Sequence, residues 1–281
     1  MSSDRSRLEA LTEATIDDLA RGFHLPERAR LTRLLLRPAS HGFAVRIAAF
    51  DDEVAEHGLA AGARREIPTF ARSLTTVGRE LIPAAGPVLA VANHPGVIDA
   101  LSLMLALEAR PDLKVVALDR PFLRALPGVA ARLIWVDVDR PSGALRAARE
   151  HLRHGGAVLT FPAGTIEPDP MVTDGALASL ERWARSTDLL VRHVADLRVV
   201  PLAVGGVLSV RALRTPLVRR ARTRADREWL AATLQVIFRR FHDTDVRILV
   251  GEPFVPDADP TAELIARMRT LLNRLAAETA G

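Results

Sequence analysis

The chain has 281 residues, a length suited to one α/β domain with an additional helical segment. Hydrophobic residues make up 48% of the sequence and charged residues 26%, which is enough apolar material for a large core. Cysteine is absent, so disulfides, thiolate metal sites and a cysteine nucleophile are excluded. The formal net charge is +4, and the cations are almost all arginine, because Lys114 is the only lysine.

Residues 1–82 are predicted to form two or three amphipathic helices and contain no convincing strand. Leu31, Leu34 and Leu35 recur at helical spacing, with arginines between and beside them. Helix breaks are expected near three prolines, Pro26, Pro38 and Pro68. The pattern leaves two interpretations open for these helices, which are a membrane-facing anchor and a layer that packs on the sheet.

Short apolar runs alternate with helical patterns from about residue 87 onward. The expected strands are 88–92, 115–118, 133–138, 157–161, 199–204 and 246–250. The expected helices are 101–108, 122–131, 143–154, 175–186, 228–241 and 261–277. This alternation predicts an α/β fold with a mostly parallel central sheet flanked by helices. We therefore expect an N-terminal helical region at 1–82 and an α/β domain at 83–281.

The sequence shows no transmembrane segment, since no stretch approaches the roughly 18 uncharged apolar residues that a spanning helix needs. The first five residues are polar and lead into no apolar region, so they do not resemble a signal peptide. We expect a soluble or peripheral protein of the cytoplasm, at the inner face of the cell membrane. The basic stretch 211–227 is either a patch for anionic lipid headgroups or a solvated helix.

Two loops concentrate polar residues beside proline and glycine. The loop 93–99 follows the first strand of the α/β domain, and the loop 161–167 follows the fourth. In sheets of this kind, binding residues collect on the loops that leave the carboxyl ends of the strands. We therefore expect these two loops to form two walls of one site.

The first loop contains His94 and Asp99. A histidine accepts a proton near neutral pH, and a carboxylate partner fixes its tautomer and stabilises the imidazolium. Pro95 and Gly96 favour a turn that brings Asp99 back to the ring. No Gly-x-Ser-x-Gly nucleophile elbow occurs, so such a base is expected to activate a substrate hydroxyl. The alternative interpretation is that His94 caps a strand end and Asp99 starts the next helix.

The segment Asn93-His94-Pro95-Gly96-Val97-Ile98-Asp99 resembles the Asn-His-x-x-x-x-Asp signature of the lysophosphatidic acid and glycerol-phosphate acyltransferase superfamily. The resemblance continues in the family's order over about residues 87–254. It comprises Arg-Pro-Phe-Leu-Arg-Ala-Leu-Pro-Gly at 120–128, a strand leading to Arg140, Phe-Pro-Ala-Gly-Thr at 161–165, and a proline-containing apolar strand at 200–204.

This resemblance implies transfer of a fatty acyl group from an acyl thioester, either acyl-CoA or acyl carrier protein, to a lysophospholipid- or glycerol-type hydroxyl. It implies His94 as the general base, held by Asp99, with backbone amides around Gly96 or Gly164 stabilising the oxyanion. The implied substrate-binding residues are Asn93, Gly96, Arg120, Arg140, Phe161, Pro162, Gly164, Thr165 and Glu167. We expect no metal and no organic cofactor. The expected partners are the thioester donor, the lipid acceptor and an anionic membrane surface, and no nucleic acid is expected.

The sequence departs from the family pattern in the third motif. Ala163 stands where the family has a glutamate, and Ile166 stands where an arginine commonly follows Gly-Thr. Because those family residues help to bind the acceptor's glycerol and phosphate, their loss puts a phosphorylated acceptor in doubt. Glu167 either replaces the missing carboxylate or is a solvated loop acid. Arg120 and Arg140 either pair with a phosphate or are surface arginines.

Two other functions stay open from the sequence. One is a non-catalytic lipid-binding homologue, in which the altered Phe-Pro-Ala-Gly-Thr loop has lost turnover. The other is an acyl-thioesterase, in which water replaces the acceptor at the same base. Release of free thiol from an acyl-CoA, with and without lysolipids, separates the three functions.

Overall fold

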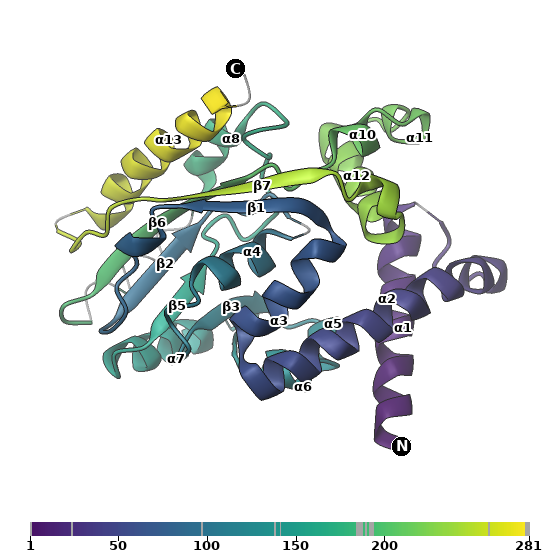
Figure 1. Ribbon diagram of the computed structural model, residues 1–281, viewed down its shortest axis with the longest axis horizontal. Coiled ribbons are helices and arrows are strands. Elements are labelled where there is room, and N and C mark those ends of the chain that lie inside the picture. Colours follow the sequence, from purple (N-terminus) through teal and green to yellow (C-terminus); the bar gives the residue numbers. More distant parts are fainter. Residues whose placement is uncertain are drawn as a thin grey trace.

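The computed structural model describes residues 2–23, 25–96, 98–137, 139–140, 142–183, 188, 190, 194–257 and 259–278. Within these ranges one sheet is formed by β1 (Ala71–Val77), β2 (Val88–Ala92), β3 (Lys114–Leu118), β4 (Leu133–Val136), β5 (Ala157–Thr160), β6 (Arg198–Gly205) and β7 (Thr244–Val250). The strand order is β1-β7-β6-β2-β5-β3-β4 (Figure 1). Every neighbouring pair is parallel except β6 and β7. The predicted mostly parallel α/β fold is confirmed.

The helices surround this sheet and extend beyond it. They are α1 (Ser2–Gly22), α2 (Arg30–His57), α3 (Leu59–Glu66), α4 (Asp99–Ala106), α5 (Pro121–Arg124), α6 (Pro127–Ala130), α7 (Ser142–Arg153), α8 (Ala176–Ser179), α10 (Val210–Leu213), α11 (Pro216–Arg219), α12 (Arg224–Ile237) and α13 (Pro260–Glu278). Short 3-10 helices lie at Ile67–Thr69, Arg79–Leu81, Leu180–Arg182 and Arg239–Phe241.

The expected elements of the α/β part lie close to those observed, with three main differences. The helix expected at 122–131 is divided into α5 and α6, because Pro127 lacks an amide hydrogen and begins a new helix. The helix expected at 175–186 is reduced to α8 and a 3-10 turn, and its last residues lie outside the described ranges. The strand expected at 133–138 ends at Val136, and Val138 is likewise not described.

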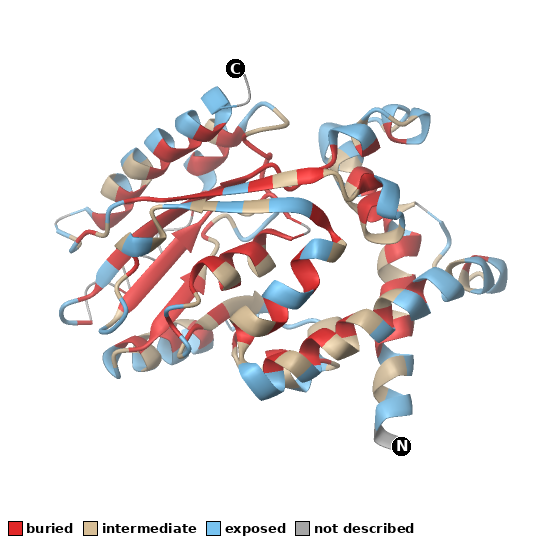
Figure 2. Ribbon diagram, in the orientation of Figure 1, coloured by how far each residue is buried: buried red, intermediate tan, exposed pale blue. Residues whose placement is uncertain are grey.

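The strand β2 shows how the sheet is buried on both faces. Side chains alternate along a strand, so Val88 and Ala90 pack into one core, with α3 and α4, while Leu89 and Val91 pack into another, with α7 and α13. All five residues of β2 are buried, which explains their continuous apolar run. Figure 2 shows the central strands as buried. The end of β2 therefore holds the loop that follows it on a rigid, fully packed strand.

The strand β1 corrects the prediction that residues 1–82 contain no strand. It pairs in parallel with β7 at the edge of the sheet, so the boundary expected at residue 82 falls after an integral strand. Its sequence, Ala-Arg-Ser-Leu-Thr-Thr-Val, is mostly polar because most of its side chains are exposed or half-buried. A polar edge strand lacks the apolar pattern by which sequence reasoning finds strands.

The N-terminal helices pack against the α/β part. Phe50 and Val54 of α2 enter the main core, and the carboxylate of Asp51 accepts the amide of Val129 in α6 at 2.7 Å. The break expected at Pro38 does not occur, since α2 runs through it. Arg33 and Arg37, which flank it, pair with acidic residues of α1 and hold this part of the helix in place. These contacts make α1 and α2 part of the packed body of the protein.

The helices α10, α11 and α12 form a small third core of their own. The helix α12 also packs against α1, so the two helices lie side by side at one end of the sheet (Figure 1). No helix in the described ranges combines the length and the apolar character that crossing a membrane requires.

Candidate active site

His94 and Asp99 meet at the carboxyl end of β2. Nδ1 of His94 lies 2.7 Å from Oδ2 of Asp99, so the predicted turn between them is confirmed. Gly96 makes this turn with a φ of +91°, and its amide donates to the same carboxylate oxygen at 2.9 Å. The side chain of His94 is 29% exposed, whereas that of Asp99 is 2% exposed. With Nδ1 bonded to the buried carboxylate, Nε2 is the ring nitrogen that is available to a substrate.

Asp99 also begins α4, and its Oδ1 accepts the amide of Ala100 at 2.6 Å. Asp99 therefore starts the helix and also pairs with His94, whereas the N-cap residue is Ile98 and makes no side-chain cap bond. Because Asp99 is fixed by two backbone amides, it holds the imidazole in a defined orientation.

Burial lowers the pKa of His94, but the charge and hydrogen bond of Asp99, and then the charge of Glu167, raise it by more. Arg120 opposes this effect, and the net pKa of His94 is raised above its ordinary value. A base with a raised pKa is a stronger proton acceptor, provided that the pH is high enough to keep it neutral.

Glu167 is not the solvated loop acid that was one interpretation of the sequence, because it is only 1% exposed. Its Oε2 accepts the backbone amide of His94 at 2.8 Å, and its own amide donates to the carbonyl of His94 at 2.8 Å. Its Oε1 accepts from Ser179 Oγ at 2.7 Å and from Trp183 Nε1 at 2.8 Å. The carboxylate of Glu167 is thus directed to the backbone amide of His94 and to the side chains of Ser179 and Trp183. A substrate contact of Glu167, in place of the glutamate that the family has at position 163, is not supported.

Asn93 is buried and has both of its amide groups engaged. Its Nδ2 donates to the carbonyl of Val204, and its Oδ1 accepts the amide of Val204, both at 2.8 Å. The side chain therefore continues the pairing of β2 with β6 by one step beyond the strand. The expected substrate contact is not supported, because this side chain is buried and both of its polar atoms bond Val204. Its effect is to fix the backbone just before His94.

The second predicted loop forms the other wall beside His94, as expected. The ring of Phe161 lies 4.6 Å from the His94 ring, centroid to centroid, at 34°. Pro162 is buried, whereas Gly164 and Thr165 are exposed at the tip. The amide of Gly164 donates to the carbonyl of Phe161, and that of Gly96 donates to Asp99. Both glycine amides named as oxyanion donors thus already have acceptors within the chain.

The two arginines differ in their distance from His94. Arg120 follows β3, two strands from β2 in the sheet, and its charge acts on the pKa of His94. It lines a cavity of about 310 Å³ with Asp17, Asp18 and Arg21. Arg140 follows β4, one strand further away, which is about 14 Å from β2 at the usual strand spacing. It is exposed, and the structure does not bring it to His94.

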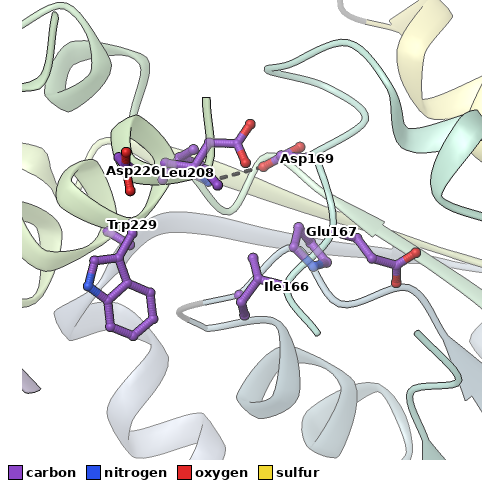
Figure 3. Close-up of a pocket in the computed structure, with 11 residues that line it drawn as sticks. Ile166, Glu167, Asp169, Leu208, Asp226 and Trp229 are labelled. Carbon is purple, nitrogen blue, oxygen red and sulfur yellow. Dashed lines mark hydrogen bonds between the residues drawn. The ribbon is translucent and has the colours of Figure 1, made fainter. Parts of the chain in front are cut away.

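A cavity of about 320 Å³ adjoins the His94 segment, and α12 forms one of its walls (Figure 3). Its lining residues are Pro95, Gly96, Ile166, Glu167, Asp169, Leu208, Ala225, Asp226, Glu228, Trp229 and Ala232. Trp229 and Ala232 also line a second cavity of about 230 Å³, whose other apolar residues are Leu19, Phe43, Phe122 and Val236. The two cavities therefore share a wall residue pair on α12, and the second cavity lies among residues of α1, α2, α5 and α12.

Sequence reasoning missed the contribution of α12 and the role of Asp169. Asp169 is 1% exposed and accepts the amides of Met171, Gly206, Val207 and Leu208 at 2.7–3.1 Å. It joins the loop that follows Glu167 to the end of β6, and Figure 3 shows its bond to Leu208 above the cavity. The dipeptide Asp-Pro at 169–170 predicts a turn, but it does not indicate that the carboxylate accepts amides at 206–208. Among the described residues, no cluster of three or more histidines or acidic residues is arranged to hold a metal ion.

Comparison with known proteins gives three findings. Residues 73–205 match the family model described as acyltransferase. A solved structure, the 1-acyl-sn-glycerophosphate (LPA) acyltransferase PlsC from Thermotoga maritima, is similar at 18% identity and a TM-score of 0.49, over 92% of this chain and 87% of that one. No curated protein sequence matches the chain.

Proposed function

We propose that the chain is a member of the glycerolipid acyltransferase superfamily, and that it transfers a fatty acyl group from an acyl thioester to a lipid hydroxyl with His94 as general base. The match of residues 73–205 to the acyltransferase family model supports this proposal. The observation that carries the proposal is the His94–Asp99 pair at 2.7 Å, with Nε2 left for a substrate beside an open cavity. The adjoining apolar cavity supports a substrate with a hydrocarbon chain, because it offers Leu19, Phe43 and Phe122 as lining.

In the proposed reaction, Nε2 of His94 removes the proton of the acceptor hydroxyl as its oxygen attacks the thioester carbonyl carbon. A new C–O bond forms, and the carbonyl electrons move to oxygen to give a tetrahedral oxyanion. When the carbonyl reforms, the C–S bond breaks and the leaving thiolate takes the proton from the His94 imidazolium. The products are an ester and a free thiol. Asp99 stabilises the imidazolium between the two proton transfers.

The oxyanion needs hydrogen-bond donors, which are usually the largest electrostatic contribution to such reactions. Because the Gly96 and Gly164 amides are engaged, we propose that the exposed tip around Thr165 supplies them, from its backbone amides. This tip lies on the same loop as Phe161, whose ring contacts His94.

We also propose that the protein acts at an anionic membrane surface in the cytoplasm. The first turns of α2 expose Leu31, Leu34 and Leu35 by 66–69%, and arginines flank them. The α10–α12 segment adds exposed Leu217 and several exposed arginines. Exposed leucines beside basic residues fit the boundary between acyl chains and anionic headgroups.

The test of the transfer reaction measures free thiol released from an acyl-CoA and from an acyl carrier protein thioester, with and without a panel of lysolipids. Release that depends on the acceptor supports the proposal. Release without any acceptor identifies a thioesterase, and no release from either donor identifies a non-catalytic protein. Mass spectrometry of the lipid product then shows which acceptor has gained the acyl group.

The test of the base is His94→Ala. Loss of the proton acceptor is expected to lower thiol release by at least about 100-fold while the circular dichroism spectrum is kept. His154→Ala is the matched control, because His154 is exposed and its ring bonds only the carbonyl of Glu150. Retained turnover in the His94 variant contradicts the mechanism.

A further inference from the structure

The cavity beside His94 presents little charge to a ligand. None of its described lining residues is arginine, lysine or histidine. The carboxylate of Glu167 turns away from the cavity and accepts from Ser179 and Trp183. The carboxylate of Asp169 is enclosed by the four backbone amides that donate to it. Neither of these two acids therefore offers an oxygen to a molecule in the cavity.

Two further carboxylates in the lining come from α12, and the charge of each is compensated. Glu228 is mostly buried and forms an ion pair with Arg224, whose Nε lies 3.5 Å from its Oε1. Asp226 lies in the first turn of α12, where the positive end of the helix dipole offsets a negative charge. The described lining thus provides no cation to pair with a phosphate and no unpaired carboxylate to bind an amine.

Ile166 lies against the turn that holds His94. Its side chain is 44% exposed and lines the cavity. A Cβ atom at Gly96 would be 3.0 Å from Cδ1 of Ile166, so the isoleucine packs directly on this turn. An acceptor that reaches His94 from this cavity therefore places the groups beside its hydroxyl against an apolar side chain.

Trp229 lines the same cavity from α12, opposite Ile166 (Figure 3). It is 40% exposed. A Cβ atom at Gly22 of α1 would be 3.0 Å from its Nε1, and Figure 3 shows this nitrogen on the side of the ring away from Ile166. The indole therefore presents hydrocarbon to the cavity. Trp229 also lines the second, apolar cavity, so the same side chain adjoins the space proposed for a hydrocarbon chain.

A lining of this kind selects its ligands by charge. A phosphate monoester that enters the cavity gives up water and finds no cation there, whereas a hydrocarbon or an uncharged glycerol group loses far less. Arg120 does not supply that cation, because it lines the separate cavity with Asp17, Asp18 and Arg21, where acids and arginines are equal in number. The lining therefore favours an acceptor that is uncharged near its hydroxyl.

We infer that the acceptor is an uncharged single-chain lipid alcohol, such as a monoacylglycerol or a long-chain alcohol, and that Ile166 is the residue that selects it over a phosphate monoester. The inference rests on the proposed function, since it assigns the acceptor of that reaction to this cavity. The hydroxyl reaches Nε2 of His94, and the hydrocarbon beside it lies between Ile166 and Trp229.

The first experiment measures binding and needs no turnover. 1-Decanol and decyl phosphate, at concentrations where both are monomeric, are titrated against the protein while tryptophan fluorescence is followed. The alcohol is expected to bind at least about tenfold more tightly, because the phosphate is desolvated without a cation. The fluorescence change is expected to disappear in Trp229→Phe. Equal binding, tighter binding of the phosphate, or a change that persists in Trp229→Phe overturns the inference.

The second experiment measures acceptor preference by thiol release. The ratio of kcat/KM for monoacylglycerol to that for lysophosphatidate is expected to exceed about 10 in the wild type. Ile166→Arg adds a cation to the cavity and is expected to lower this ratio by at least about tenfold. Val255→Arg is the matched control, because it adds the same charge at an exposed apolar residue outside the cavity, and its ratio is expected to stay unchanged.

The outcomes separate this inference from the proposed function. A wild type that prefers lysophosphatidate, or a ratio that is unchanged in Ile166→Arg, overturns the inference and keeps the proposed function. No release with any acceptor overturns the proposed function, while the binding experiment still decides which ligand class the cavity takes.

Discussion

Glu167 and His94 exchange two hydrogen bonds, although they are 73 positions apart in the chain. The carboxylate of Glu167 accepts the amide of His94, and the amide of Glu167 donates to the carbonyl of His94, each at 2.8 Å. These bonds join the loop after β5 to the loop after β2. Glu167 is therefore a positioning residue, which acts on the proposed base through its backbone and through its charge.

The change Glu167→Gln is expected to lower kcat by about tenfold and to leave the KM of the thioester donor unchanged, because the His94 segment loses its anchor. It also removes a charge that raises the pKa of His94, so the acid limb of the pH–rate profile moves to lower pH. Loss of one charged acceptor in a buried network costs about 2 kcal/mol of unfolding free energy. Steady-state kinetics from pH 5 to 9 and urea unfolding check these effects. Glu181→Gln, in an exposed position of the same region, is the control.

The change Asp99→Asn is expected to lower kcat by about 1,000-fold, because the imidazolium loses its carboxylate and the tautomer is no longer fixed. In the wild type, burial lowers the pKa of His94, but Asp99 and Glu167 raise it by more, so it lies above 6.5. Since the base acts when neutral, kcat/KM of the wild type rises with pH through this raised pKa. In the variant, the pKa of His94 is lower, so the acid limb of the pH–rate profile of the residual activity moves to lower pH. An acid limb that stays in place contradicts the assignment of Asp99.

The same pair predicts how stability depends on pH. Folding raises the pKa of His94, so the folded state favours its protonated form. This contribution to stability is complete below the unfolded-state pKa of about 6.5 and is lost as the pH rises through the folded-state pKa. The difference in unfolding free energy between the wild type and Asp99→Asn is therefore expected to be larger at pH 5.5 than at pH 9. Urea unfolding at both pH values measures it, and a larger difference at pH 9 contradicts the pairing.

The change Asp169→Asn is expected to destabilise the fold by about 3 kcal/mol. The carboxylate accepts four backbone amides, and an asparagine places an NH2 group against some of these donors. Thermal unfolding measures the loss. Asp174→Asn, an exposed position on the same loop, is the control and is expected to unfold within about 0.5 kcal/mol of the wild type. A stable Asp169→Asn variant would show that the amides find other partners.

The membrane proposal predicts that replacing Leu31, Leu34 and Leu35 together with glutamine lowers flotation with anionic vesicles by at least about tenfold. The physical reason is the loss of three apolar side chains that are exposed by 66–69% and available for the bilayer boundary. The control is Val255→Gln, which alters an exposed apolar residue outside α2. Unchanged flotation of the triple variant removes α2 from the proposed membrane surface.

The sequence by itself determined the features whose causes are local. The buried strand β2 followed from a continuous apolar run, and the contact of His94 with Asp99 followed from five residues of separation around Pro95 and Gly96. The parallel sheet followed from the alternation of strand and helix patterns, each of which is set by neighbours along the chain. Such patterns predict the shape of a turn or strand because few conformations of a short segment compete with it.

Only the tertiary structure decided which distant side chains reach these local features. The polar strand β1 is held by its pairing with β7, about 170 residues further along the chain. The sequence predicts that the carboxylate of Glu167 contacts either solvent or substrate. In the structure it instead accepts the backbone amide of His94, and the side chains of Ser179 and Trp183 donate to its other oxygen. The wall formed by Trp229 and Glu228 depends on where α12 docks. Burial and long-range hydrogen bonds determine these positions, and neither of them produces a repeating residue pattern that could be recognised in the sequence.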